Sequence, residues 1–106
     1  MDPARAIVVV TTVGTRAEAR AMARTLVERQ LVACAQISEI ESFYRWDGEI
    51  RDDAEFRLWL KTVPERYDDV EAALRGLHPY ELPAIYAIPV AHVDAAYAEW
   101  VETASR

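Results

Sequence analysis

A long β-hairpin constrains the fold of this chain more than any other feature of its sequence. Asp47-Gly48 is typical of a two-residue turn between antiparallel strands, because both turn positions must accept a positive φ. The flanking residues 32–46 and 49–62 are rich in β-branched and aromatic side chains, which favour strands. Each arm of about 13 residues would extend roughly 43 Å, whereas an ordinary strand has about 5 to 6 residues. We therefore expect part of the hairpin to project and to be covered by another copy of the chain.

The length and charge of the chain limit its class. With 106 residues, the sequence predicts a single domain over residues 1–106. The apolar fraction of 52% indicates a globular chain. The chain has a net charge of −6 and therefore lacks the excess of basic residues that is typical of nucleic-acid binders, so we expect no nucleic-acid partner. The longest apolar run, residues 6–10, is far too short to span a membrane, so we expect no membrane association.

The N-terminus and the cysteine content indicate a compartment. No apolar signal segment follows the first five residues, and the chain has one cysteine, Cys34. A lone thiol stays reduced in the cytosol. The sequence therefore predicts a cytoplasmic protein.

Three helices are predicted around the hairpin. Thr15 and Glu18 form a capping box that opens the first helix. Its apolar stripe is predicted to be Ala19, Met22, Ala23, Leu26 and Val27.

The second and third helices follow the hairpin. Pro64 suits the first turn of the second helix, and Gly76 is its predicted C-terminal stop. Its stripe is Tyr67, Val70, Leu74 and Leu77. Asp94 caps a last helix in which Val93, Tyr97, Trp100 and Val101 align.

Two more strands complete the order of elements. Residues 6–11 are a continuous β-branched run, which is typical of a buried central strand, and residues 84–88 form a short strand that ends at Pro89. The resulting order is β-α-β-β-α-β-α. With right-handed crossovers, this order predicts an α+β, ferredoxin-like split-βαβ fold with a four-stranded antiparallel sheet.

The two-residue turn sets the register of the hairpin. It places Ala35 and Ile37 on one face with Leu58 and Leu60, where they would meet the helices. The opposite face would carry Cys34, Gln36, Ile40, Tyr44 and Trp46, together with Arg57, Trp59 and Lys61. This second face is too aromatic to stay in water, so we expect Ile40, Tyr44, Trp46 and Trp59 to lie between subunits.

Strict alternation of side chains between the two faces of the hairpin produces one unfavourable pair of opposite residues. It puts the charged Glu39 directly opposite the aromatic Phe56. An extra residue in one strand would remove this conflict. We therefore expect a β-bulge near residues 38–40.

Cys34 and His78 are the candidate metal ligands, and each has a second interpretation. Cys34 is either a small core residue or a ligand. His78 opens a loop held by Pro79 and Pro83, where it either bonds to backbone at a subunit contact or binds a ligand or metal. A thiolate with an imidazole suits copper best. No C-x-x-C or H-x-x-x-H motif is present.

Other polar residues suggest a ligand cleft without catalysis. Glu55 and Lys61 would point to one face of their strand, either as part of an ion-pair network or as cleft residues. Tyr80 and Glu81 follow His78 in the loop, and Arg45 lies near the hairpin tip. No nucleophile and base can be paired, so we expect no enzymatic activity. No phosphate-binding glycine loop is present, so no organic cofactor is expected.

These stretches resemble the CutA family of divalent-ion tolerance proteins. The matching pieces are Leu31-Val32-Ala33-Cys34, the stretch from Ser42 to Ile50, Leu60-Lys61-Thr62, His78-Pro79-Tyr80-Glu81 and Tyr97-Ala98-Glu99-Trp100. The resemblance implies a ferredoxin-like homotrimer, similar in layout to PII signalling proteins, that binds copper or another divalent cation. It puts Cys34 on the family's Ala-Cys position and His78 on its His-Pro-Tyr position.

This chain departs from the resemblance at three places. Thr11 or Thr12 stands where some members have a further cysteine, Leu77 where some have a second histidine, and Ala84 where glutamate is usual.

The sequence leaves three hypotheses for the function. The first is a cytosolic homotrimer that binds divalent metal ions such as copper. The second is a PII-like trimer that binds a small anionic ligand at clefts between subunits, with Lys61, His78 and Arg45 supplying positive charge. The third is an oligomeric scaffold without a ligand.

Overall fold

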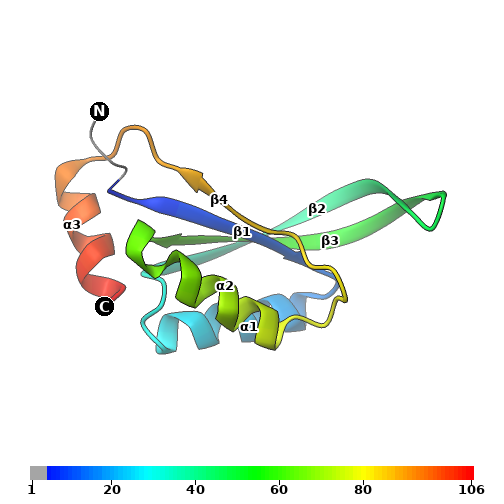
Figure 1. Ribbon diagram of the computed structural model, residues 1–106, viewed down its shortest axis with the longest axis horizontal. Helices are drawn as coiled ribbons and strands as arrows, with labels where there is room; N and C mark the ends of the chain where they lie inside the picture. Colours follow the sequence, from blue (N-terminus) through cyan, green and yellow to red (C-terminus); the bar gives the residue numbers. More distant parts are fainter. Residues whose placement is uncertain (1–4) are drawn as a thin grey trace.

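A computed structural model describes residues 5–106 and confirms the predicted fold class. The order of elements is β1 (Ile7–Val13), α1 (Arg16–Glu28), β2 (Cys34–Trp46), β3 (Glu49–Thr62), the 3-10 turn η1 (Pro64–Arg66), α2 (Tyr67–Leu77), β4 (Ile85–Pro89) and α3 (Ala95–Ala104). The four strands form one antiparallel sheet in the order β2-β3-β1-β4. Both α1 and α2 cover one side of this sheet, and α3 lies across one end (Figure 1).

The hydrophobic core lies between the sheet and the two helices. Leu58 and Leu60 of β3 and Val9 of β1 are fully buried against Leu26 of α1 and Leu74 of α2. Thr15 caps α1 as predicted, since its hydroxyl accepts from the Glu18 amide at 3.2 Å. The predicted stripe of α1 is correct except for Val27, which is 40% exposed.

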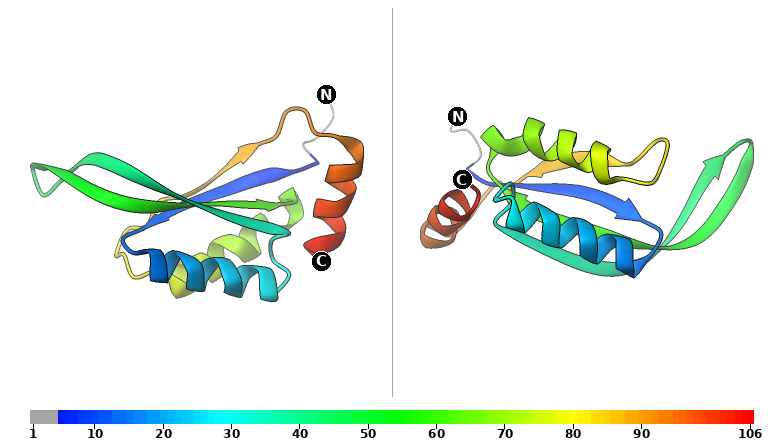
Figure 2. Two further views of the ribbon diagram at one scale, coloured as in Figure 1. Left: turned by 180° about the vertical axis from the view of Figure 1, so that it is seen from behind. Right: turned by 90° about the horizontal axis from the view of Figure 1, so that it is seen from below.

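The hairpin extends far beyond the rest of the sheet. β1 pairs with β3 only as far as Val13 opposite Phe56, so within residues 5–106 no third strand lies beside residues 40–55. We call residues 40–55 the ribbon; Figure 2 shows it twisting away from the helices in both views. The radius of gyration is 14.5 Å, against about 13 Å expected for a compact chain of this length. The predicted projection of the hairpin is therefore confirmed.

The register of the hairpin is set by its turn, and the expected β-bulge is wrong. Asp47 and Gly48 both have positive φ, and every pair from Cys34 with Lys61 to Trp46 with Glu49 is in unbroken register. Glu39 does lie opposite Phe56. The conflict is resolved by Arg16 at the start of α1, whose guanidinium lies 4.9 Å from the Phe56 ring centroid and 3.6 Å from the Glu39 carboxylate. One side chain therefore accommodates both members of the pair.

Two helix ends differ from the prediction. Gly76 lies inside α2 rather than after it, and the helix ends at Leu77 because His78, which precedes Pro79, is extended at ψ 133. In α3 the buried side chains are Ala98 and Val101, while Tyr97 and Trp100 remain 37% and 48% exposed. Ala98 and Val101 therefore pack inward, and Tyr97 lies beside Lys61 of β3.

The side of the sheet away from α1 and α2 remains largely uncovered, and we call it the open face. Alternation along the strands gives this face Val8, Val10, Thr12, Cys34, Gln36, Ser38, Arg57, Trp59, Lys61, Tyr86 and Ile88. Trp59, Tyr86 and Ile88 are 38%, 50% and 42% exposed. The register also places Ile40, Tyr44 and Trp46 on this side of the ribbon, as predicted.

Candidate functional site

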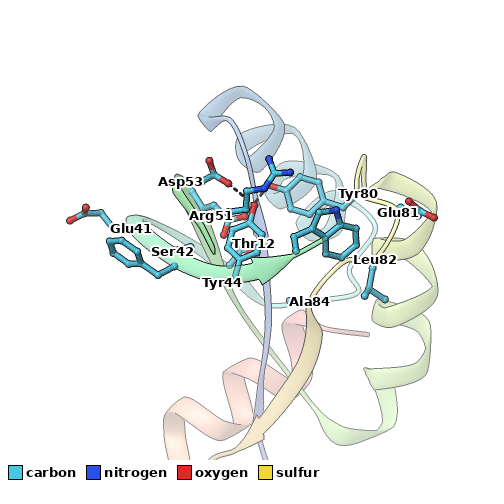
Figure 3. A pocket seen from close by; sticks show the side chains of 13 residues that line it. Thr12, Glu41, Ser42, Tyr44, Arg51, Asp53, Tyr80, Glu81, Leu82 and Ala84 are labelled. Atoms are coloured by element: carbon cyan, nitrogen blue, oxygen red, sulfur yellow. Dashed lines mark hydrogen bonds between the residues drawn. The ribbon is translucent and has the colours of Figure 1, made fainter. Parts of the chain in front are cut away.

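A hollow lies at the root of the ribbon. It is a cavity of about 920 Å³ between the ribbon, the end of β1 and the loop before β4. Figure 3 shows Arg51, Tyr44 and Tyr80 toward its middle, with Glu41 and Glu81 at its margins. Its lining is Thr12, Glu41, Ser42, Phe43, Tyr44, Trp46, Arg51, Asp53, Glu55, Tyr80, Glu81, Leu82 and Ala84.

Two phenol–carboxylate pairs span the cavity. Tyr80 donates its hydroxyl to Glu55 at 2.9 Å, and Tyr44 donates its hydroxyl to Asp53. Burial, followed by the hydrogen bond to Glu55, raises the pKa of the Tyr80 phenol well above its usual range. The hydrogen bond to Asp53 is the main cause that raises the pKa of Tyr44. Both phenols therefore remain protonated and donate to their carboxylate partners.

The loop from His78 to Ala84 positions Tyr80 in the cavity. The Tyr80 backbone amide donates to Nδ1 of His78 at 3.1 Å, and the two rings lie 4.8 Å apart between centroids. Gly14 leaves room for the phenol, because a Cβ there would lie 3.3 Å from the Tyr80 hydroxyl. Thr12, at the end of β1, accepts from His78 Nε2 at 2.9 Å. The histidine thus fixes the loop against the sheet.

His78 is a neutral imidazole with both nitrogens occupied inside the subunit. Because Nδ1 accepts from the Tyr80 amide, the ring proton resides on Nε2, which donates to the Thr12 carbonyl. Burial lowers the pKa of His78, and the bond to Thr12 opposes this effect. A metal ion at His78 would have to displace one of these two hydrogen bonds.

Protonation of His78 should therefore destabilise the fold. Its pKa is lower in the folded chain than the usual value of about 6.5 in the unfolded chain, so the unfolded state binds more protons between the two values. The free energy of unfolding should be highest above about pH 6.5 and fall as the pH drops toward the lowered pKa. Guanidinium titrations between neutral and mildly acidic pH measure this slope. His78→Gln, which keeps an amide near the loop but does not titrate, should flatten the slope; an unchanged slope would mean that another group causes it.

Cys34 lies far from His78. Cys34 is opposite Lys61 at one end of the sheet, whereas His78 contacts Thr12, which is opposite Arg57. The four residue-to-residue steps from Arg57 to Lys61 alone extend roughly 13 Å, compared with about 2.0 to 2.3 Å for a metal–ligand bond. The two candidates cannot share an ion within one chain. Over residues 5–106, no group of three or more His, Cys, Asp and Glu side chains is placed to hold a metal ion.

The cavity brings together only some of the predicted cleft residues. Glu55, Tyr80 and Glu81 line it as a group. Arg45 points to the other side of the ribbon, opposite Ile50, and the Lys61 ammonium lies 5.5 Å from the Tyr97 ring centroid on the open face. Asp53 and Arg51 also line the cavity, and neither was among the predicted cleft residues. The alternation of β3 could have identified them, because they precede Glu55 by two and four residues on the same face.

The net charge of the cavity is negative. Four carboxylates, those of Glu41, Asp53, Glu55 and Glu81, line it against the single guanidinium of Arg51. A cleft lined by one sign of charge raises the local concentration of the opposite ion. The cavity is therefore electrostatically suited to a cation.

The fold and the cavity define a class of protein before any relative is considered. The class is a ferredoxin-like sheet with a projecting two-stranded ribbon and an acidic, aromatic cavity at the ribbon's root. Residues 7–104 match the family model described as CutA1 divalent ion tolerance protein. The chain belongs to this family.

Relatives and solved structures agree with this assignment. The divalent-cation tolerance protein CutA of Thermus thermophilus is 38% identical over 95 residues, which span 89% of this chain and 92% of the relative. The CutA protein of Pyrococcus horikoshii is 36% identical over 95 residues, spanning 90% and 93%. The structure described as the periplasmic divalent cation tolerance protein CutA from Archaeoglobus fulgidus has a TM-score of 0.93 at 30% identity and covers 95% of this chain and 99% of that one.

The relatives' descriptions name a tolerance to ions and no reaction. Within residues 5–106, no helix is long and apolar enough to cross a membrane.

Proposed function

We propose that this protein is a non-enzymatic, cytosolic homotrimer that binds divalent cations and thereby contributes to cation tolerance. The observation that supports cation binding best is the charge of the cavity, where four carboxylates face one guanidinium. The family's description as divalent ion tolerance proteins points to the same class of ligand. Cys34 is the chain's one thiol, which fits a reducing compartment.

The trimer is supported by surfaces that one chain cannot cover. The ribbon exposes Phe43, Tyr44, Trp46 and Ile50 by 41% to 70%, and the open face exposes Trp59, Tyr86 and Ile88. Contiguous exposed apolar surface of this kind marks interaction sites. The oligomer covers both surfaces, with Ile40, Tyr44, Trp46 and Trp59 at its interfaces.

The cation site lies between subunits in this proposal. Asp53 and Glu55 supply two carboxylates in one chain, and a third ligand must come from another copy because residues 5–106 gather no set of three. Oxygen ligands suit hard divalent ions. Copper remains the ion that Cys34 and His78 would suit, in a site shared between one copy's thiol and another copy's imidazole.

Calorimetric titration of manganese and copper into matched variants distinguishes these two sites. Asp53→Asn with Glu55→Gln removes the charges but keeps an acceptor for each phenol. We expect this double variant to weaken divalent-ion binding by at least about tenfold, or about 1.4 kcal/mol. Cys34→Ser with His78→Gln should bind as the wild type does.

The control is Glu28→Gln with Asp68→Asn, which removes the same charge from exposed helix positions. The opposite pattern, in which only the thiol and imidazole variant loses copper, would place the ion at the soft pair and contradict the carboxylate site.

A small anionic ligand is the second candidate. Arg51 supports it, because a guanidinium inside a cavity of this size can pair with a carboxylate or phosphate. The four surrounding carboxylates make an anion the less favourable occupant. A nucleotide or small acid at about 100 times its dissociation constant that adds about 2.7 kcal/mol of stability would support this candidate. If neither anions nor metal ions bind, the remaining hypothesis is the oligomeric scaffold without a ligand.

A further inference from the structure

The cavity at the root of the ribbon is larger than a metal ion requires. Its volume of about 920 Å³ falls in the range of small-molecule sites, about 300 to 1,000 Å³. A divalent ion with six oxygen ligands the size of water would fill only roughly 200 Å³. Over residues 5–106, no three His, Cys, Asp or Glu side chains converge on one point to hold an ion. The space therefore suits a larger cation.

Glu55 carries a buried charge that the described part of the chain does not neutralise. The residue is only 8% exposed and lines the cavity. Its carboxylate accepts from the neutral phenol of Tyr80 at 2.9 Å, but among residues 5–106 no basic nitrogen lies within 4.0 Å of it. Buried charges in proteins are generally paired. The missing positive charge is therefore expected from an occupant of the cavity.

Arg51 does not supply that charge. It lines the same cavity, yet it forms no ion pair with any carboxylate of residues 5–106. The acidic groups are also spread out. Asp53 lies two residues from Glu55 on β3, roughly 7 Å away along the strand, and Glu41 and Glu81 lie at the margins (Figure 3). An occupant with several separated positive charges matches this distribution better than a single ion does.

The cavity also has an aromatic lining. Tyr44 and Trp46 of β2 lie on the same side of the ribbon as Glu55, and Tyr80 enters from the loop before β4. Tyr44 and Trp46 are 42% and 41% exposed, so their rings remain accessible in the single chain. Aromatic faces attract ammonium groups and pack against methylene groups. A metal ion has no methylene groups, whereas an alkylamine has both.

We propose that this cavity binds a linear aliphatic polyamine, whose ammonium groups pair with Glu55 and the other carboxylates while its methylene groups pack on the aromatic rings. This inference rests on the proposed cation-binding function and names an organic cation as the occupant of the same cavity. The assembled protein is the form to test, because the proposed cation site lies between subunits.

Two pairs of probes test the chemistry by calorimetric titration. Spermidine should bind at least about tenfold more tightly than hexaamminecobalt(III), which carries the same charge but no methylene groups. Cadaverine should bind more tightly than lysine, which adds a carboxylate to the same chain and is repelled by the cavity. Equal affinities in the first pair would reduce the binding to charge alone and overturn the inference. Tighter binding of lysine would overturn it in favour of an amino acid.

Two variants with opposite expected effects place the polyamine in the cavity. Glu55→Gln keeps an acceptor for Tyr80 and should weaken spermidine binding by at least about tenfold. Arg51→Gln removes the one guanidinium of the lining and should tighten binding by about threefold or more. The controls Glu28→Gln and Arg20→Gln make the same charge changes on exposed α1 and should bind as the wild type does. Sedimentation velocity verifies that each variant assembles normally. Equal weakening in Glu55→Gln and Glu28→Gln would place spermidine on the acidic surface and overturn the inference.

Competition with manganese separates this inference from the proposed function. Spermidine and manganese that displace each other would support both. Manganese binding without spermidine binding would overturn the polyamine and leave the divalent-cation site standing. Spermidine binding without manganese binding would support the polyamine and contradict the divalent-cation site. If neither binds, both proposals are wrong.

Discussion

Replacing Trp59 with glutamate is expected to convert the assembly into folded monomers. Trp59 lies on the open face, opposite Gln36 and Val10, and the residue is 38% exposed. Buried tryptophans are among the side chains that contribute most to interfaces, commonly about 2 kcal/mol or more when truncated. In the proposed homotrimer, this loss recurs at every interface between copies. The monomer itself should remain folded, because the new carboxylate lies beside Arg57 and Lys61.

Sedimentation velocity and circular dichroism of Trp59→Glu measure the two halves of this expectation. Val27→Glu is the matched control, because Val27 is a similarly exposed apolar residue, 40% accessible, on α1 in the helix layer. The control should assemble normally. Trimers that persist in Trp59→Glu would show that the open face is not the contact surface.

Replacing Leu58 with alanine is expected to lower the free energy of unfolding by about 2 to 5 kcal/mol. Leu58 is fully buried beneath α1 and α2 and belongs to the main core cluster. The loss combines the transfer free energy of the removed methyl groups with the cost of the remaining cavity. Because a domain of this size is stable by only about 5 to 15 kcal/mol, the variant is expected to be marginal.

Guanidinium unfolding at one fixed protein concentration measures this loss, since the stability of an oligomer depends on concentration. Leu82→Ala removes the same atoms from a side chain that is 70% exposed, so it should change stability by less than about 0.5 kcal/mol. Equal losses in the two variants would contradict the position of the core.

The backbone fold was predictable because several local signals agree. Asp47-Gly48 fixes the turn, and the period of two in β2 and β3 then fixes which side chains face the helices. Val9, Leu26 and Leu74 follow from strand and helix periodicity. Local preferences that agree with the global fold are what make a sequence foldable.

One error arose where a distant residue decides the local structure, and the other where two neighbouring helix-stop signals compete. The bulge near Glu39 is unnecessary because Arg16, 23 positions earlier, contacts both Glu39 and Phe56. Gly76 is a plausible helix stop, but the extended His78 before Pro79 ends the helix instead. The residues next to Glu39 in the sequence do not include Arg16, so local reasoning could not find the side chain that contacts both Glu39 and Phe56.

The candidate site was predictable only in part. Tyr80 and Glu81 were identified because prolines hold their loop, and Glu55 because of its place on the strand. The pairing of Tyr80 with Glu55 joins residues 25 positions apart, and only the tertiary fold brings them together. Lys61 was expected in the same cleft, but it lies at the other end of the sheet, beside Tyr97. The sign of the cavity's charge therefore became visible only with the structure.

Sedimentation equilibrium of the wild-type chain in dilute solution tests the central claim most directly, because uncovered ribbons and open faces require other copies. We predict a species of three times the 12.0 kDa chain mass that persists on dilution. A stable, folded species of 12.0 kDa would contradict the account, since the aromatic surfaces of the ribbon and the open face would then remain in water.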